Sequence, residues 1–509
     1  MRRPFVFSIQ IFVLFLFVFS GIASTDSGPI FTHGVASGDA SPYGAVLWVR
    51  TDQEALVKAE VSTSPDFDNL VFKETMLSSA ENDFTVKVRA EPLEPDQLYY
   101  FRWRHGNRVS ETGVFRTAPE PAASAGVRFA FTGDSDGTKV NGAPFYNQFE
   151  TLEAARSETL DFFIYLGDTI YSDSGLRSTG PASSLADYRQ TYRENREVQA
   201  LRDLMSANSV FALWDDHEVR NDFDGQTVDA SLYANGRQAF FEYMPNEELQ
   251  TIQDPACAGA PQFRVVHWGK DVDLIFLDER SCRSADVTPA CSFSPTIVDL
   301  APTLPAPYRV AFGLPASPPP GCLAAIFDPA RTMLGSVQKQ LFKAALLESD
   351  AKFKFVINPL PIQQFYALPY DRWEGYGAER NEILNFIRSN GISNVIFLTT
   401  DTHATLVNEV FVDRFADPAP IAQEFVTGPI ATNTMEKQIL AQYPTMLAAF
   451  HAALSITGVD CRHLNKYSYG LVEVDSANGT ATIKIKDDTG AVIIDQLNPA
   501  VQCMWTSAP

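Results

Sequence analysis

The chain contains 509 residues, of which 45% are apolar and 20% are charged, and its formal net charge is −22. This length is sufficient for two or three domains with a large core. The negative charge disfavours nucleic acids and anionic membrane surfaces as partners and favours attraction of cations.

The N-terminus has the features of a secretory signal. Arg2 and Arg3 precede a long apolar stretch that ends at Phe19, and small residues follow it. We predict a signal peptide over residues 1–24, and therefore a protein exported to the periplasm, the cell surface or the extracellular space. Because the apolar stretch is long for a signal, an uncleaved membrane tether is the alternative.

Residues 29–117 have the pattern of an all-β domain. Ala45–Val49 and Phe84–Ala90 are strand-like, and the second segment alternates between apolar and polar residues. Leu93–Tyr99 has the spacing of the tyrosine corner found in fibronectin-type and Ig-like sandwiches. We therefore predict an N-terminal β-sandwich domain, followed by an Ala-, Pro- and Ser-rich linker over residues 118–126.

Residues 127–509 alternate between short apolar runs and helical patterns, which predicts a layered α/β domain. The helical patterns cover Phe145–Ser157, Ser184–Met205, Tyr233–Met244, Gly335–Glu348 and Glu379–Ser389. Thr288–Gly321 is rich in Pro and Ala and predicts a long irregular insertion. Gly470–Val474 and Thr480–Lys486 predict a hairpin that closes a second sheet. Asn478 and Gly479 between them form a turn signal, although Asn478 also begins a glycosylation acceptor.

Six cysteines in an exported chain predict disulfide bonds, with free buried thiols as the alternative. Cys461 and Cys503 are close in sequence near the C-terminus and predict one bridge. The other four, whose pairing the sequence leaves open, are Cys257, Cys282, Cys291 and Cys322. We expect disulfides to hold both the Pro-rich insertion and the C-terminus.

Acidic residues repeatedly follow the apolar runs of this region. The runs and the residues that follow them are Val127–Phe131 with Asp134, Phe162–Leu166 with Asp168, Val210–Trp214 with Asp215 and Asp216, Leu274–Leu277 with Asp278, and Val395–Thr399 with Asp401. Any one of these could be a helix cap. Together they predict carboxylates gathered at one edge of one sheet, where ligands bind. Such carboxylates repel one another, and a metal cluster would stabilise them.

Several neighbouring residues suit the same chemistry. Tyr171 follows Asp168 by three residues and could be a phenolate ligand or simply a packed aromatic. His217 and Asn221 follow Asp216, and carboxylate and amide oxygens suit a hard metal ion. Asp401 and His403 lie two residues apart, on one side of an extended segment, so His403 is more plausible as a ligand than as a core histidine.

Six longer motifs then occur in order along the chain: FTHGVASGDASPYGAVLWVRT, FFIYLGDTIY, FALWDDHEVRND, LIFLDERSCR, RWEGYGAER and FLTTDTHAT. In these motifs the chain resembles the PhoD-like alkaline phosphatase and phosphodiesterase family, within the calcineurin-like metallophosphoesterases. The resemblance covers nearly the whole mature chain. It implies a metallophosphoesterase-type core, with two mixed sheets flanked by helices, behind the N-terminal sandwich.

The resemblance also implies Fe³⁺ and Ca²⁺ as cofactors. Asp168, Tyr171, Asp401 and His403 would surround the iron, and Asp168, Asn221 and Asp216 would face calcium. Arg280 and His217 would lie on the phosphate side. Asp134 stands where the family usually has a cysteine, so a hard carboxylate replaces a soft thiolate and other divalent metals are possible.

The implied activity is metal-dependent phosphoester hydrolysis by a metal-activated hydroxide. Arg280 would neutralise charge on the phosphate oxygens, and His217 would protonate the leaving group. We expect a small phosphoester substrate, no nucleic acid and a monomeric protein. A phospholipase D-like phosphodiesterase acting on phospholipid headgroups is the first alternative, and a non-catalytic binding or adhesion protein is the second.

Overall fold

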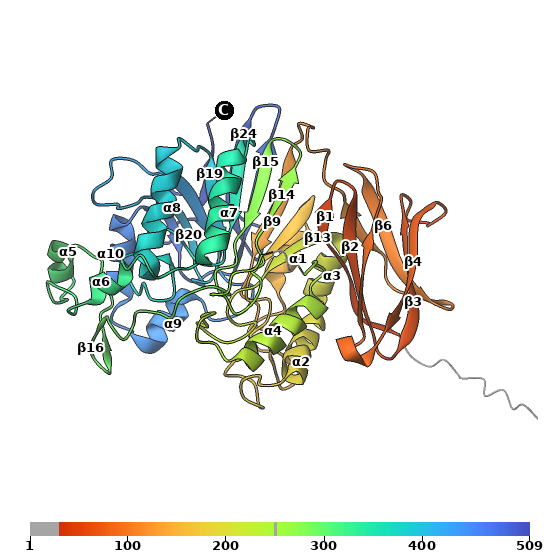
Figure 1. The fold of residues 1–509 in the computed structure, drawn as a ribbon, viewed down its shortest axis with the longest axis horizontal. Helices are drawn as coiled ribbons and strands as arrows, with labels where there is room; N and C mark the ends of the chain where they lie inside the picture. The colour runs from red at the N-terminus through yellow and green to blue at the C-terminus, as the bar shows by residue number, and fades with distance from the viewer. Residues whose placement is uncertain (1–29, 249–251, 509) are drawn as a thin grey trace, which may run out of the picture.

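The structure, a computed structural model, describes residues 30–248 and 252–508, so the predicted signal peptide lies outside the described residues. Two large β-sheets pack face to face, helices cover their outer faces, and a smaller sheet lies at one end (Figure 1). Within the described part, no helix has the length and apolar character that crossing a membrane requires.

The first large sheet has nine strands in the order β25-β24-β23-β9-β12-β13-β1-β2-β5. The central strands β9, β12, β13 and β1 are parallel, and the flanking pairs are antiparallel. The bounds are β1 (Phe31–Ser41), β2 (Gly44–Thr51), β5 (Thr85–Ala90), β9 (Val127–Thr132), β12 (Phe162–Leu166), β13 (Ser209–Leu213), β23 (Ser468–Asp475), β24 (Thr480–Asp487) and β25 (Met504–Thr506).

The second large sheet has seven strands in the order β14-β15-β18-β19-β21-β20-β22. β15, β18, β19 and β21 are parallel, and the outer strands pair antiparallel. The bounds are β14 (Arg264–Trp268), β15 (Val272–Phe276), β18 (Phe353–Ile357), β19 (Val395–Thr399), β20 (Thr405–Val410), β21 (Ala422–Val426) and β22 (Val459–His463).

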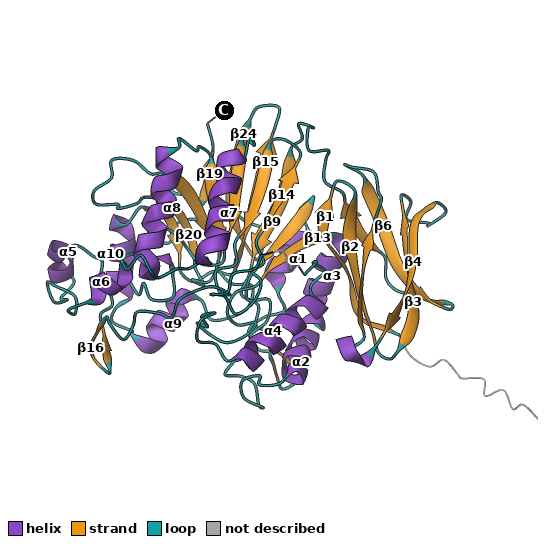
Figure 2. Ribbon diagram, in the orientation of Figure 1, coloured by secondary structure: helices purple, strands orange, loops and turns teal. Residues whose placement is uncertain are grey.

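Aromatic and branched side chains from the two sheets form the central core. Phe129 stacks on Phe162 within the first sheet and meets Phe355 of the second sheet edge to face, with ring centroids 5.5 Å apart. The five residues of β12 are all buried, because helices cover the opposite face of the sheet. The fold is therefore a four-layer α/β/β/α arrangement (Figure 2), the predicted metallophosphoesterase-type core.

The helices divide between the two sheets. The first sheet is covered by α1 (Glu150–Arg156), α2 (Leu185–Arg196), α3 (Gln199–Ala207) and α4 (Ala230–Tyr243), and the second by α7 (Gly335–Glu348) and α8 (Gly377–Ser389). The pattern over Ser184–Met205, predicted as one helix, is two helices separated at Glu197 and Val198.

The N-terminal sandwich is present, and its smaller sheet has five strands: β3 (Ala55–Ser62), β4 (Leu70–Ser78), β6 (Leu98–His105), β7 (Arg108–Val109) and β8 (Gly113–Arg116). Its other sheet is β1, β2 and β5, which continue the first large sheet because β1 pairs with β13. The backbone N–H of Glu94 donates to the Tyr99 hydroxyl at 2.9 Å, which confirms the predicted tyrosine corner. The two predicted domains thus share one sheet.

Two sequence expectations about the sheets are wrong. The acidic strand ends come from both large sheets rather than from one, because β9, β12 and β13 belong to the first and β15 and β19 to the second. The β23–β24 hairpin extends the first sheet, pairing with β9, instead of closing the second. Apolar runs predict buried strands, but they do not record which sheet a strand joins.

All six cysteines form disulfides. Cys461 pairs with Cys503 as predicted, and the pairs that the sequence left open are Cys257–Cys282 and Cys291–Cys322. The second of these closes the Pro-rich insertion. The remaining elements are α5 (Ala306–Ala311), α6 (Cys322–Ile326), α9 (Met435–Gln442), α10 (Leu447–Ile456), η1 (Ala80–Asn82), η2 (Trp373–Tyr376), β10 (Lys139–Val140), β11 (Ala143–Pro144), β16 (Ser292–Ser294) and β17 (Ile297–Val298).

Candidate metal centre

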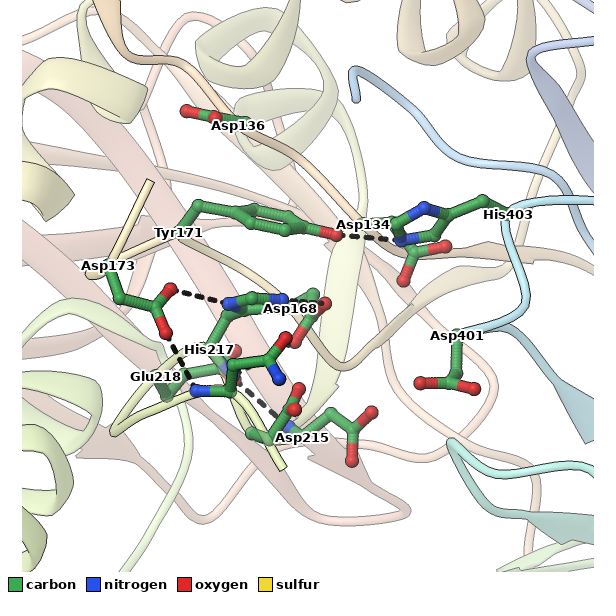
Figure 3. Close-up of polar contacts among 12 residues, drawn as sticks. Asp134, Asp136, Asp168, Tyr171, Asp173, Asp215, His217, Glu218, Asp401 and His403 are labelled. Atoms are coloured by element: carbon green, nitrogen blue, oxygen red, sulfur yellow. Dashed lines mark hydrogen bonds and ion pairs between the residues drawn. The ribbon is translucent and has the colours of Figure 1, made fainter. Parts of the chain in front are cut away.

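The loops at the carboxyl ends of both large sheets meet and bring together most of the predicted ligands, although Asp401 and Asn221 belong to none of the groups described below. Figure 3 shows the side chains of Asp168, Tyr171, His217 and His403 gathered together, whereas Asp136 points away from them. Glu218 ties the loops after β12 and β13, since its carboxylate accepts from the Thr169 backbone N–H at 2.6 Å and also from the Asp215 backbone. The position of each loop is therefore fixed by its neighbours.

Four candidate ligands lie on left-handed backbone. The φ angles are 61° for Asp134, 46° for Asp168, 62° for Asp401 and 54° for His403. This conformation costs a non-glycine residue about 1–2 kcal/mol. Such strain concentrates at functional sites, where the surrounding structure holds the backbone in place. Here it turns side chains from the strand ends into one space.

The first group of candidate ligands is Asp134, Asp168 and His403, which offer ligand atoms that all lie within 4.8 Å of one another. Tyr171 belongs beside this group, because its hydroxyl lies 2.9 Å from Nε2 of His403. One carboxylate oxygen of Asp134 accepts from the Thr400 hydroxyl. Its other oxygen, Oδ1, is buried and has no hydrogen-bond partner among the described residues, as expected for an atom that binds a cation.

Two groups contact the Nδ1 side of His403. Nδ1 lies 2.9 Å from the carbonyl oxygen of Asn433, which can only accept, and 2.6 Å from the side-chain nitrogen of Gln438. Burial lowers the pKa of His403 to about 4, and the ring is neutral at pH 7. In the tautomer with its hydrogen on Nδ1, donated to Asn433, Nε2 would offer a lone pair to a cation shared with Asp134 and Asp168. Metal-binding histidines have this arrangement.

The second group is Asp168, Asp216 and His217, whose candidate ligand atoms also lie within 4.8 Å of one another. Asp168 thus belongs to both groups, as a bridging carboxylate would. Nδ1 of His217 lies 2.5 Å from Oδ1 of Asp173, and Nε2 lies 3.9 Å from Asp168. The Tyr171 ring stacks on the imidazole with centroids 4.0 Å apart. Burial lowers the pKa of His217, but Asp216 and Asp173 more than offset this and raise it to about 9.

The third group is Asp216, Asp222 and Asp371. Asp371 is held by two buried arginines. Arg280 donates through both terminal nitrogens to it at 2.8 and 2.9 Å, and Arg283 donates at 2.5 Å. The two guanidinium groups outweigh burial and hold the pKa of Asp371 well below its usual range.

Arg280 is fully buried, and its Nε donates to Asp215 at 2.5 Å. Asp401 lies 4.0 Å from the same guanidinium. The predicted phosphate-side arginine therefore contacts carboxylates in this structure. Its Nη2 also lies 3.7 Å from Asp216, so the guanidinium borders the candidate metal ligands as well as Asp371.

Asn221 is exposed, and its side-chain amide donates to Asp222 at 2.7 Å while its backbone N–H donates to Asp173. Asn221 therefore lies next to the second and third groups, and its role as a ligand stays a prediction.

The concentration of buried acid has an electrostatic consequence. Burial raises the pKa of Asp134 to about 7 and that of Asp215 to about 8. Burial and the nearby carboxylates raise the pKa values of Asp168 and Asp401 well above the usual range. Cations bound between these groups would reverse the shifts, because a cation stabilises the ionised carboxylate. The donor set of carboxylates, imidazole and phenol fits a centre with more than one metal ion.

The sequence analysis missed Asp173, Asp222, Arg283 and Asp371. Asp173 lies two residues after Tyr171, in a turn, so its proximity in sequence to the FFIYLGDTIY motif is the signal that could have identified it. Asp371 directly precedes the RWEGYGAER motif, and Arg283 ends LIFLDERSCR. Both positions lie in or next to a motif, but their contacts depend on how loops far apart in the sequence meet.

Sequence models of two domain families match the chain: PhoD-like phosphatase over residues 136–485, and the N-terminal domain of PhoD-like phosphatase over residues 20–119. The chain is 29% identical over 425 residues to alkaline phosphatase D of Bacillus subtilis (strain 168). This similarity covers 75% of the chain and 66% of the relative, so the chain spans just under two thirds of that relative's length.

Two solved structures share the fold. The structure of PhoD superposes with a TM-score of 0.72 at 23% identity, covering 94% of this chain and 90% of that one. The structure of a purple acid phosphatase from yellow lupin (Lupinus luteus) seeds superposes with a TM-score of 0.57 at 11% identity, and the match covers 93% of this chain and 74% of that one. Both confirm the metallophosphoesterase-type architecture. Because the first family model also covers well over half of the described sequence, the chain belongs to the PhoD-like phosphatase family.

Proposed function

We propose that the protein is an exported metal-dependent phosphoester hydrolase. The observation that carries the proposal is the position of Asp168, whose carboxylate lies within 4.8 Å of ligand atoms of Asp134 and His403 in one group and of Asp216 in another. A carboxylate shared in this way would help to hold two cations, and two cations together would clamp a phosphoryl group during hydrolysis. The family supports the same activity.

By the resemblance, the ligands would divide between two metal ions. Asp134, Asp168, Tyr171, Asp401 and His403 would hold Fe³⁺. Asp168, Asp216 and Asn221 would hold Ca²⁺, with other divalent metals possible because Asp134 supplies oxygen in place of sulfur. When bound, such cations lower the pKa of water and neutralise charge on phosphate oxygens.

The protein's own groups supply the proton transfer. With Nδ1 of His217 directed at Asp173, the Nε2–H is the donor left to protonate the leaving oxygen. The raised pKa of His217 keeps that proton in place near neutral pH. Arg280 and Arg283 balance the carboxylates around Asp371, and Arg280 would offer its positive charge to a phosphate bound beside Asp216.

Further parts of the proposal concern the whole molecule. Residues 1–24 would be a signal peptide, the chain would be a monomer, and its substrate would be a small phosphoester. The experiment is to purify the protein, measure its metals, and assay matched mono- and diesters before and after chelation. We expect turnover that chelation abolishes and metal restores. A metal-replete, folded protein that cleaves neither ester would overturn the proposal and favour a binding protein.

A further inference from the structure

An apolar pocket of about 100 Å³ lies where the Pro-rich insertion meets helices α9 and α10. Figure 1 shows α5, α6, α9 and α10 together at the end of the molecule opposite the N-terminal sandwich. The lining of the pocket is almost wholly aliphatic and aromatic, and it includes Leu304, Leu314, Leu368, Tyr443, Met446 and Phe450. Leu368 and Tyr443 are each 45% exposed, which is unusual for large apolar side chains that lie close together.

Both walls of the pocket belong to segments that reach the candidate metal centre. Leu368 is three residues before Asp371, whose carboxylate binds Arg280. On the other wall, the N–H of Met435, at the start of α9, donates to the carbonyl of His403 at 2.9 Å. The α9 residue Ile439 then lines the pocket. The pocket is thus connected to the site along the chain, through one loop and one helix.

The insertion holds its wall of the pocket in place. The Leu368 N–H donates to the carbonyl of Leu300 at 2.7 Å, and the Tyr370 hydroxyl donates to the carbonyl of Asp299. Asp299 also forms a fully buried ion pair with Arg309 at 2.7 Å. The Cys291–Cys322 disulfide closes the same segment. A pocket with fixed walls binds without a large ordering cost.

The size and polarity of the pocket limit what it can bind. Complete small-molecule sites measure about 300–1,000 Å³, so a pocket of this size fits only part of a ligand. Its lining lacks the polar groups that a sugar or nucleoside would need when buried. A short alkyl chain or a single aromatic ring meets both conditions.

We propose that this pocket binds the apolar group esterified to the phosphate, so that the protein prefers amphipathic phosphoesters over small polar ones. The inference rests on the proposed function and deepens it by naming the substrate class. The phosphate would lie at the metal centre, and the alkyl or aryl group would extend along Leu368 toward α9 and α10.

The test uses alkyl phosphates and alkyl methyl phosphates with chains of one to eight carbons, and it follows release of the alcohol. For the natural protein we expect KM to fall by up to about fourfold for each added methylene, until the pocket is full. A calorimetric titration with the matching alkylphosphonates, which cannot be hydrolysed, should give the same trend in Kd.

Helix α10 offers matched variants. Ala449 and Ala453 line the pocket, whereas Ala448 and Ala452 are exposed on another side of the same helix. Ala449→Phe and Ala453→Phe should remove at least tenfold of the preference for octyl over methyl esters and leave turnover of methyl esters unchanged. Ala448→Phe and Ala452→Phe carry the same added ring and should keep the preference.

The outcomes separate the two proposals. If no ester is hydrolysed, the proposed function fails, and the phosphonate titration alone then tests the pocket. If methyl esters are hydrolysed but KM and Kd do not change with chain length, the inference fails while the hydrolase stands. An equal loss of activity for every chain length in Ala449→Phe and Ala453→Phe would also overturn it, because the pocket would then support the fold without binding substrate.

Discussion

Asp173 and His217 form a close pair, with 2.5 Å between a carboxylate oxygen and Nδ1 of the imidazole. Asp173 also accepts the backbone N–H of Asn221 at 2.7 Å, so its carboxylate is held from two sides. Because His217 Nδ1 is occupied, only Nε2 can serve the substrate, and this nitrogen lies on the Asp168 side. The pair therefore fixes both the orientation and the charge of the proposed acid.

Asp173→Asn should lower kcat about 10–100-fold with little change in metal content. The amide no longer stabilises the imidazolium, so the pKa of His217 falls and the alkaline limb of the pH–rate profile should move to lower pH. Asp224→Asn, a change of a half-buried carboxylate that caps the Thr227 backbone, is the control. An unchanged pH profile in Asp173→Asn would contradict the proposed acid.

Asp168→Asn should remove most bound metal and lower turnover by about 10³-fold or more, because one carboxylate serves both groups of ligands. Elemental analysis and turnover should be measured on the same sample. Asp136→Asn is the matched control: Asp136 follows the same strand as Asp134 but bonds to Thr138 and Ser174 instead. Normal metal content in a folded Asp168→Asn protein would contradict the shared-ligand arrangement.

Chelated protein should lose stability as pH rises from about 4 to 8. The folded pKa values of Asp134 and Asp215, about 7 and 8, lie above the usual 3.8. Their contribution to the free energy of unfolding is therefore fully present below about pH 4 and is lost as pH rises through the folded values. Denaturant titration at several pH values measures this. Asp134→Asn should show a weaker pH dependence, and an identical profile in both chelated proteins would contradict the prediction.

Glu424→Gln should change the free energy of unfolding more favourably at pH 8 than at pH 4.5, with a difference on the order of 2–3 kcal/mol. Burial raises the pKa of Glu424 to about 7, so the natural protein loses this stability as pH rises from 4.5 through 7. Nδ2 of Asn408 donates to the Glu424 carboxylate at 2.8 Å, so the Gln amide would donate to Asn408 once the Asn408 amide turns and presents Oδ1, which has no partner among the described residues. Glu409→Gln on the neighbouring strand is the control. Equal pH dependence in both variants would refute the prediction.

Tyr171→Phe tests the iron assignment. If the Tyr171 phenolate binds Fe³⁺, the protein should be coloured by a charge-transfer band, and the variant should lose the band while keeping its fold. Since Asp134 supplies only oxygen, Asp134→Cys should retain metal and shift the band. Visible spectra with metal analysis decide this. A colourless, active natural protein containing only other divalent metals would refute ferric iron and leave the hydrolase proposal in place.

The sequence by itself predicted the strands, the acidic loops and the family. Apolar runs such as Phe162–Leu166 are buried strands because only a sheet covered on both faces accommodates them. The residues after those runs predicted Asp134, Asp168 and His403 as one cluster, and the structure brings them within 4.8 Å. Local pattern is sufficient here because strand ends share one side of the fold.

Only the tertiary structure decided which loops meet across the two sheets. Asp371 and Arg280 are separated by 91 residues, and no local pattern relates them. The pairing of Cys257 with Cys282 and the continuation of the N-terminal sandwich into the main sheet through β1 and β13 likewise depend on long-range packing. Hydrophobic periodicity specifies which residues are buried, but it carries no information about their partners, because burial is non-directional whereas hydrogen bonds and ion pairs need a defined geometry.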